Sequence, residues 1–198
     1  MKFLTAADKK FKPMLDRLIE SVIALKYDII VYDLGGLGFG IPYDAPVSDT
    51  MFQKNPVKPR YILEMLQSLK KNELLIWLDA DTVLKHRIDE IENDEFDLGV
   101  TIRKEKKGKN PRRGRINSGV MFFRNNERTC KFMMEWMKES ERLNGDQWAL
   151  NNLIDVAPVV NLIVKEYPGV IYNNYYFDES QNIAKILHYK TDKRNHIK

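Results

Sequence analysis

Two acidic residues, Asp79 and Asp81, stand on either side of Ala80, directly after the apolar run Leu74–Leu78. Side chains two positions apart on an extended chain point to the same side, so both carboxylates can face one site. Carboxylate oxygens are hard ligands that suit Mg²⁺ or Mn²⁺, and such a cation can neutralise a diphosphate. The pattern therefore predicts a buried strand that leads into a divalent-metal site, with two solvated loop acids as the simpler alternative.

A second interpretation of the same residues belongs to another reaction class. The string 79–83 also resembles the nucleophile motif of haloacid-dehalogenase-type phosphatases, in which Asp79 would be phosphorylated. That family usually has this motif near the start of its domain, whereas 78 residues precede Asp79 here. Its later acidic motif is also poorly met, because Leu150 stands four residues after Asp146. The phosphatase is therefore the weaker alternative.

Apolar periodicity predicts the elements that position these acids. Strands are expected at 2–7, 28–33, 74–78, 96–102, 120–123, 170–177 and 183–189, and helices at 13–23, 61–69, 130–137 and 148–154. Strands and helices alternate in the first half, which favours an α/β fold with a parallel sheet. Ligands of such sheets bind at the carboxyl ends of the strands, where Asp8, Asp33 and Asp79 fall.

Length and composition limit the protein classes. The chain has 198 residues, 43% of them apolar, so we expect one domain over 1–198 with a sizeable core. No apolar stretch approaches the roughly 20 residues that span a bilayer. The one cysteine, Cys130, cannot form an internal disulfide, which fits a reducing compartment and a cytoplasmic location.

The positive charge is concentrated in residues 103–115. This basic segment holds eight Lys or Arg residues and one acid, whereas the remainder holds 24 basic and 27 acidic residues. A mildly acidic domain with one basic segment does not resemble a general nucleic-acid binder, so no nucleic-acid partner is expected. The segment is either a solvated loop, or a lid or docking surface for an anionic acceptor or a membrane surface, which would make the protein peripheral at the membrane.

Four motifs, in chain order, resemble those of GT-A-type nucleotide-diphosphosugar glycosyltransferases, most closely glycosyltransferase family 8. They are residues 3–8, 77–81, 116–123 and 145–151, and together they span nearly the whole chain. The resemblance implies a GT-A fold, with a Rossmann-like, mixed and mostly parallel sheet flanked by helices. It also implies transfer of a sugar from a nucleotide diphosphate, with UDP as the expected nucleotide, to the hydroxyl of a carbohydrate or other acceptor.

The resemblance also implies roles for particular residues. The metal, Mn²⁺ or Mg²⁺, would be held by Asp79, Asp81 and His188, although a hydrogen-bonded surface imidazole is the alternative for His188. The nucleotide sugar would be bound by a set that lies on the four motifs, at a helix start and in the tail: Thr5, Ala6, Ala7, Asp8, Arg60, Asp79, Ala80, Asp81, Asn117, Ser118 and Lys193. Within this set, Asp8 would position the base, Lys193 would add positive charge, and Arg60 is equally well explained as a solvated helix start.

Catalysis is assigned to Asp146 and Gln147, which the resemblance places beside the transferred sugar. Asp146, with Asn117, would hold sugar hydroxyls, and the amide of Gln147 would lie near the anomeric carbon. An inverting transferase needs a base to deprotonate the acceptor, but a glutamine amide is neutral and a poor nucleophile. With Gln147 at that position, the resemblance implies front-face attack and retention of configuration.

Overall fold

The computed structural model describes residues 1–42, 57–103, 114–156, 158, 161–176 and 178–190. Its strands are β1 (Lys2–Ala7), β2 (Ile29–Asp33), β3 (Ile41–Pro42), β4 (Leu74–Leu78), β5 (Thr82–Leu84), β6 (Leu98–Ile102), β7 (Ile116–Arg124), β8 (Val164–Pro168) and β9 (Ile186–His188). Its α-helices are α1 (Lys12–Ala24), α2 (Val57–Ser68), α3 (Glu127–Leu143), α4 (Asp146–Asn151) and α5 (Gly169–Tyr172). Short helical turns are η1 (Lys9–Phe11), η2 (Asp89–Asn93), η4 (Asn152–Val156) and η5 (Glu179–Asn182).

Seven strands form one mixed sheet in the order β3-β2-β1-β4-β7-β6-β8. Only β7 runs against its neighbours in this sheet, pairing antiparallel with β4 and with β6. The strands β5 and β9 form a separate antiparallel pair. The expected α/β fold with a mixed, mostly parallel sheet flanked by helices is therefore confirmed.

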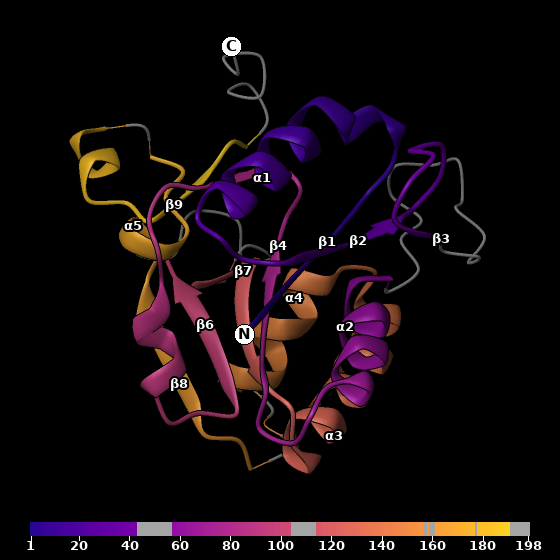
Figure 1. Ribbon diagram of the computed structural model, residues 1–198. Coiled ribbons are helices and arrows are strands. Elements are labelled where there is room, and N and C mark those ends of the chain that lie inside the picture. The colour runs from indigo at the N-terminus through magenta and orange to yellow at the C-terminus, as the bar shows by residue number, and fades with distance from the viewer. Residues whose placement is uncertain (43–56, 104–113, 157, 159–160, 177, 191–198) are drawn as a thin grey trace.

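Helices cover both faces of the sheet, and Figure 1 shows α1 on one side of the central strands with α2 and α3 on the other. All five residues of β4 are buried, and their side chains alternate between two apolar clusters. Leu75 and Trp77 pack with α2, α3 and α4, whereas Leu74, Ile76 and Leu78 pack with α1. A strand that is buried on both faces consists of consecutive apolar residues, and this is why β4 can be recognised from its sequence.

The predicted strand over 170–177 is wrong. Residues Gly169–Tyr172 form α5, the strand β8 lies just before it, and Asn174 makes only an isolated bridge to Leu187. The strand β8 ends at Pro168, which has no backbone N–H to donate. Gly169 then packs closely on β6, since a Cβ at this position would lie 2.5 Å from the carbonyl oxygen of Ile102. A short apolar run such as 170–172 fits either element, and the packing on β6 decides for the helical turn.

Within the described part of the chain, no helix is both long enough and apolar enough to cross a membrane.

Candidate active site

The metal-site candidate is built where β4 ends and β5 begins. Asp79 and Asp81 occupy the turn between these strands, and β5 pairs with β9 so that Thr82 lies opposite His188. The backbone N–H of Tyr189 also donates to the carbonyl of Asp81 at 2.7 Å. This pairing brings the end of the chain's last described strand against the acidic turn.

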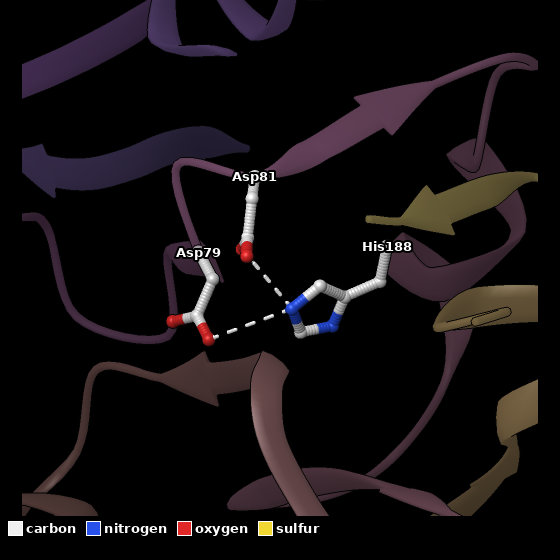
Figure 2. Close-up of side chains that lie close together, drawn as sticks. All are labelled: Asp79, Asp81 and His188. Carbon is white, nitrogen blue, oxygen red and sulfur yellow. Dashed lines mark ion pairs between the residues drawn. The ribbon is translucent and has the colours of Figure 1, made fainter. Parts of the chain in front are cut away.

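The three side chains converge on one another in Figure 2. The Nε2 atom of His188 lies 3.1 Å from Oδ1 of Asp81 and 3.9 Å from Oδ2 of Asp79. One ligand atom from each residue lies within 4.8 Å of the other two, so a single ion can contact all three. His188 and Asp81 are buried and Asp79 is partly exposed, which leaves the cluster open on the side of Asp79.

A buried hydrogen-bond chain orients the imidazole of His188. Its Nδ1 lies 2.7 Å from Oδ1 of Asn173, whose Nδ2 donates to Oγ1 of Thr101 at 2.7 Å. The Asn173 amide oxygen fixes the Nδ1 edge of the ring, so that Nε2 faces the two carboxylates. Such a support is the usual companion of a metal-binding histidine. Two carboxylates and an imidazole nitrogen therefore make a donor set that fits a divalent cation.

Gly119 makes room for this imidazole. Its carbonyl accepts the N–H of Asp79 at 2.8 Å, which fixes β7 beside the acidic turn. A Cβ at position 119 would overlap Cε1 of His188 and would lie 2.7 Å from its Nδ1 and 3.1 Å from Oδ2 of Asp79. Only glycine therefore allows His188 and Asp79 to approach each other across this strand.

Lys58, in the first turn of α2, connects the metal-site acids to Asp146. Its Nζ lies 2.9 Å from Oδ1 of Asp79 and 3.0 Å from Oδ2 of Asp146, and it donates to the carbonyl of Ser118 at 3.1 Å. Burial opposes the charge of Lys58, but the two carboxylates outweigh it and raise the pKa of the ammonium group above its usual value. Lys58 in turn helps to hold the pKa of both carboxyls below their usual range although burial opposes their ionisation.

The predicted sugar-binding residues on β7 and α4 lie at the same site. Oγ of Ser118 donates to Oδ2 of Asp146 at 3.0 Å, so the two motifs touch directly. Oδ1 of Asn117 accepts the N–H of Gly119 at 3.0 Å, whereas its buried Nδ2 has no partner among the described groups. The oxygen of the Gln147 amide accepts a hydrogen bond from Nη2 of Arg103 at 2.9 Å.

The β1 residues lie beside this site but make other contacts. Thr5 and Ala7 are buried and Ala6 is partly buried in β1, which pairs with β4 and β2. The carboxylate of Asp8 caps η1, accepting the N–H of Lys10 at 2.8 Å and of Phe11 at 3.3 Å. The roles of these residues in base binding stay predictions.

Of the predicted donor-binding residues, Arg60 does not contact the acidic cluster in the described part of the chain. Arg60 is exposed on α2 and its Nε lies 3.2 Å from Oε1 of Glu64, so the cation that α2 delivers to the site is Lys58. Lys193 lies outside the described residues, as does all of the basic segment except Arg103, Gly114 and Arg115. Ala80 is buried between the two metal-site acids.

Sequence reasoning missed the roles of Lys58 and Asn173. The sequence offers one weak signal for Lys58, a cation next to the helix that leads to Asp79, and that signal applies equally to Arg60. No pattern points to Asn173, because its partners Thr101 and His188 come from β6 and β9. These two residues are recognisable only from the tertiary contacts.

Comparisons with known proteins agree with this geometry. Residues 48–159 match the family model for nucleotide-diphospho-sugar transferases. No curated protein matches the chain. Among solved structures, a glycosyltransferase involved in the glycosylation of the major capsid of PBCV-1 is 12% identical, with a TM-score of 0.68, 98% of this chain and 95% of that chain covered.

Two further solved glycosyltransferase structures share the fold as well. GlyE of Streptococcus pneumoniae TIGR4 is 13% identical with a TM-score of 0.64, and the match covers 96% of this chain but only 54% of GlyE, about half of its length. LgtC, a galactosyltransferase in complex with donor and acceptor sugar analogs, is 14% identical with a TM-score of 0.57, with 98% of this chain and 91% of LgtC covered. At these identities the structures establish a shared GT-A fold.

The family match also decides between the two reaction classes considered above, since it favours the transferase over the phosphatase. Membership of glycosyltransferase family 8 in particular stays a prediction. With more than half of its residues matched by the family model, the chain belongs to the nucleotide-diphospho-sugar transferase family and is a glycosyltransferase.

Proposed function

We propose that this enzyme transfers a sugar from a UDP-sugar to an acceptor hydroxyl in a reaction that depends on Mn²⁺ or Mg²⁺. The observation that carries the proposal is the convergence of Asp79, Asp81 and His188 within 4.8 Å. Two carboxylate oxygens and one imidazole nitrogen suit these cations. A single catalytic domain over residues 1–198 is part of the proposal.

The ion would supply Lewis-acid stabilisation of the negative charge on the departing diphosphate. The protein's own groups prepare the site for it. Asn173 holds His188 with Nε2 toward the carboxylates, and Lys58 keeps Asp79 and Asp146 ionised and at fixed positions. Such preorganised charges act without reorganisation at the moment of reaction.

The donor sugar would lie between β7 and α4. The pKa of Asp146 is lowered, so its carboxylate is ionised, and Oδ1, the oxygen that does not pair with Lys58, can accept hydrogen bonds from sugar hydroxyls. The Nδ2 of Asn117, which has no partner among the described groups, can donate one. Ser118 supports Asp146 through its hydroxyl at 3.0 Å. A buried amide hydrogen without a partner costs about 1 to 3 kcal/mol, which favours a ligand atom at Asn117.

The proposed site makes a stereochemical prediction. Gln147 is neutral and cannot take the acceptor's proton, so the leaving diphosphate would take it on the face from which it departs. From an α-linked donor we expect an α-linked product, identified by proton NMR of the product first formed. A β-linked product would contradict retention and would require a base that is absent from the assigned roles.

The metal assignment predicts that Mn²⁺ increases the stabilisation by UDP. Ligand that binds only the native state stabilises it by mass action, by about 2.7 kcal/mol at 100 times the Kd. We expect UDP to raise the melting temperature of the wild-type protein much more with Mn²⁺ than with EDTA. Asp81→Asn should lose this metal-dependent increment, because one charged ligand is replaced by an amide.

The matched control is Asp28→Asn. Asp28 directly precedes β2, and its exposed carboxylate pairs with Lys2. This control should keep the full increment. If Asp81→Asn retains it too, the metal assignment is wrong.

A further inference from the structure

Two cations that the proposed mechanism does not use meet at one tyrosine ring. Cζ of Arg103 lies 5.9 Å and Nζ of Lys190 lies 5.1 Å from the ring centroid of Tyr175. Arg103 directly follows β6, and Lys190 follows β9 by two residues. Both residues are partly buried, so the fold places two positive charges from distant segments in one half-buried region.

No carboxylate of the described residues forms an ion pair with either cation. Arg103 donates through Nη2 to the neutral amide of Gln147, and its Nε is buried with no partner in the described part of the chain. Lys190 is partly buried with its ammonium group against the same ring. The face of a tyrosine ring compensates a cation less than a hydrogen-bonded anion does, so both charges are incompletely compensated by the described residues.

The position of the two cations connects the two halves of the active site. Lys190 lies two residues after His188, at the end of β9 that holds the imidazole beside Asp81. Arg103 holds the side chain of Gln147, the residue next to Asp146. An anion bound between them would therefore lie between the metal triad and the proposed sugar site.

We propose that Arg103 and Lys190 form an oxyanion-binding subsite that takes a phosphate or carboxylate group of the enzyme's substrates. Its position relative to the reacting groups rests on the proposed function. The planar guanidinium of Arg103 suits bidentate binding of such oxyanions, and the Lys190 ammonium adds a second charge. Two sources share this chemistry, namely the diphosphate of the donor and an acidic group on the acceptor.

The probe is inorganic phosphate in EDTA, titrated into the full chain and followed by ¹H–¹⁵N NMR. In these conditions neither metal nor nucleotide takes part, so the result does not depend on the proposed function. We expect saturable binding to the wild-type protein and an affinity at least about tenfold lower in Arg103→Met and in Lys190→Met, since each substitution removes a charged hydrogen-bond donor. Lys190→Arg keeps the charge and should retain most of the affinity.

The matched control is Lys138→Met, which removes an exposed ammonium group on α3 and should leave phosphate binding unchanged. Absence of saturable binding to the wild-type protein, or equal affinity in all variants, would overturn the proposal. An equal loss in Lys138→Met would also overturn it, because the effect would then be one of overall charge. Thermal unfolding shows whether the methionine variants fold. If one does not, Arg103→Lys and Lys190→Arg replace them. The proposal then requires that phosphate binds Lys190→Arg as tightly as the wild-type protein and binds Arg103→Lys more weakly.

Repeating the titration with saturating Mg²⁺, which is diamagnetic, and UDP identifies the source of the anion. If the donor diphosphate occupies the subsite, phosphate binding disappears in competition with UDP. If the subsite serves an acidic acceptor, phosphate still binds beside UDP, and the same two variants still weaken it. Failure of UDP to bind would contradict the proposed function, whereas the EDTA titration would still test the subsite.

Discussion

Gly119→Ala is expected to lower the affinity for Mn²⁺ by about 100-fold and to destabilise the fold by about 2 to 3 kcal/mol. The new methyl group would lie 2.7 Å from Nδ1 of His188 and 3.1 Å from Oδ2 of Asp79, so the imidazole must move. It cannot move freely, because its Nδ1 is held 2.7 Å from the buried Asn173. Calorimetric titration with Mn²⁺ measures the first effect, and urea unfolding without metal measures the second.

Gly145→Ala is the matched control. A Cβ at Gly145 meets nothing within 4 Å, and the φ of 174° is extended backbone that any residue adopts. This variant should bind Mn²⁺ as the wild-type protein does. Wild-type Mn²⁺ affinity in Gly119→Ala would show that His188 is not a ligand of the ion.

Lys58→Met is expected to cost about 2 to 3 kcal/mol of unfolding free energy at pH 7. Removing one member of a buried ion pair typically costs about 3 to 5 kcal/mol, and the value here is reduced because the side chains of Asp79 and Asp146 are 29% and 27% exposed. The variant leaves two carboxylates near each other without the ammonium group that lies about equally close to both. Urea unfolding of both proteins measures the difference.

The cost of Lys58→Met should depend on pH in a defined direction. The pKa values of Asp79 and Asp146 are lowered in the folded protein, so their contribution to stability is present above the usual carboxyl pKa, about 4, and is lost as the pH falls through the lowered values. The raised pKa of Lys58 keeps its charge throughout the neutral range. The difference between variant and wild type should therefore shrink below about pH 4.

An exposed lysine on α3 provides the comparison for this variant. Lys131 pairs with Glu127 one helical turn away, with side chains 59% and 82% exposed, and Lys131→Met should change stability by less than about 0.5 kcal/mol. If Lys58→Met costs no more than this at pH 7, Lys58 does not hold the two acids together.

Several elements were predictable because their patterns are local. The strand β4 is buried on both faces, so its five residues are all apolar and the acids that end it stand out. The apolar stripes of α2 and α3 follow the helical period and face the sheet. The pair Asp79 and Asp81 was predicted on the same basis, since alternate positions of an extended segment share a side.

Other features depend on how elements dock. The run 170–172 fits a strand or a helical turn, and the close approach of Gly169 to Ile102 decides for the turn. Lys58 and Arg60 stand two positions apart at the start of α2, and positions two apart on a helix face different directions. Only the packing of α2 against the sheet determines that Lys58 faces the acids and that Arg60 faces outward toward Glu64.

The sequence by itself determined the α/β fold, the acidic pair that we propose as metal ligands and, through the resemblance of its motifs, the enzyme class. The tertiary structure decided which groups act on that pair: the Lys58 bridge to Asp146, the Asn173 support of His188, and the meeting of Arg103 with Lys190 at Tyr175. The reason is physical. Periodicity is set by the burial of each element's own residues, whereas contacts between residues far apart in the chain arise only when the strand order and helix packing bring their elements together.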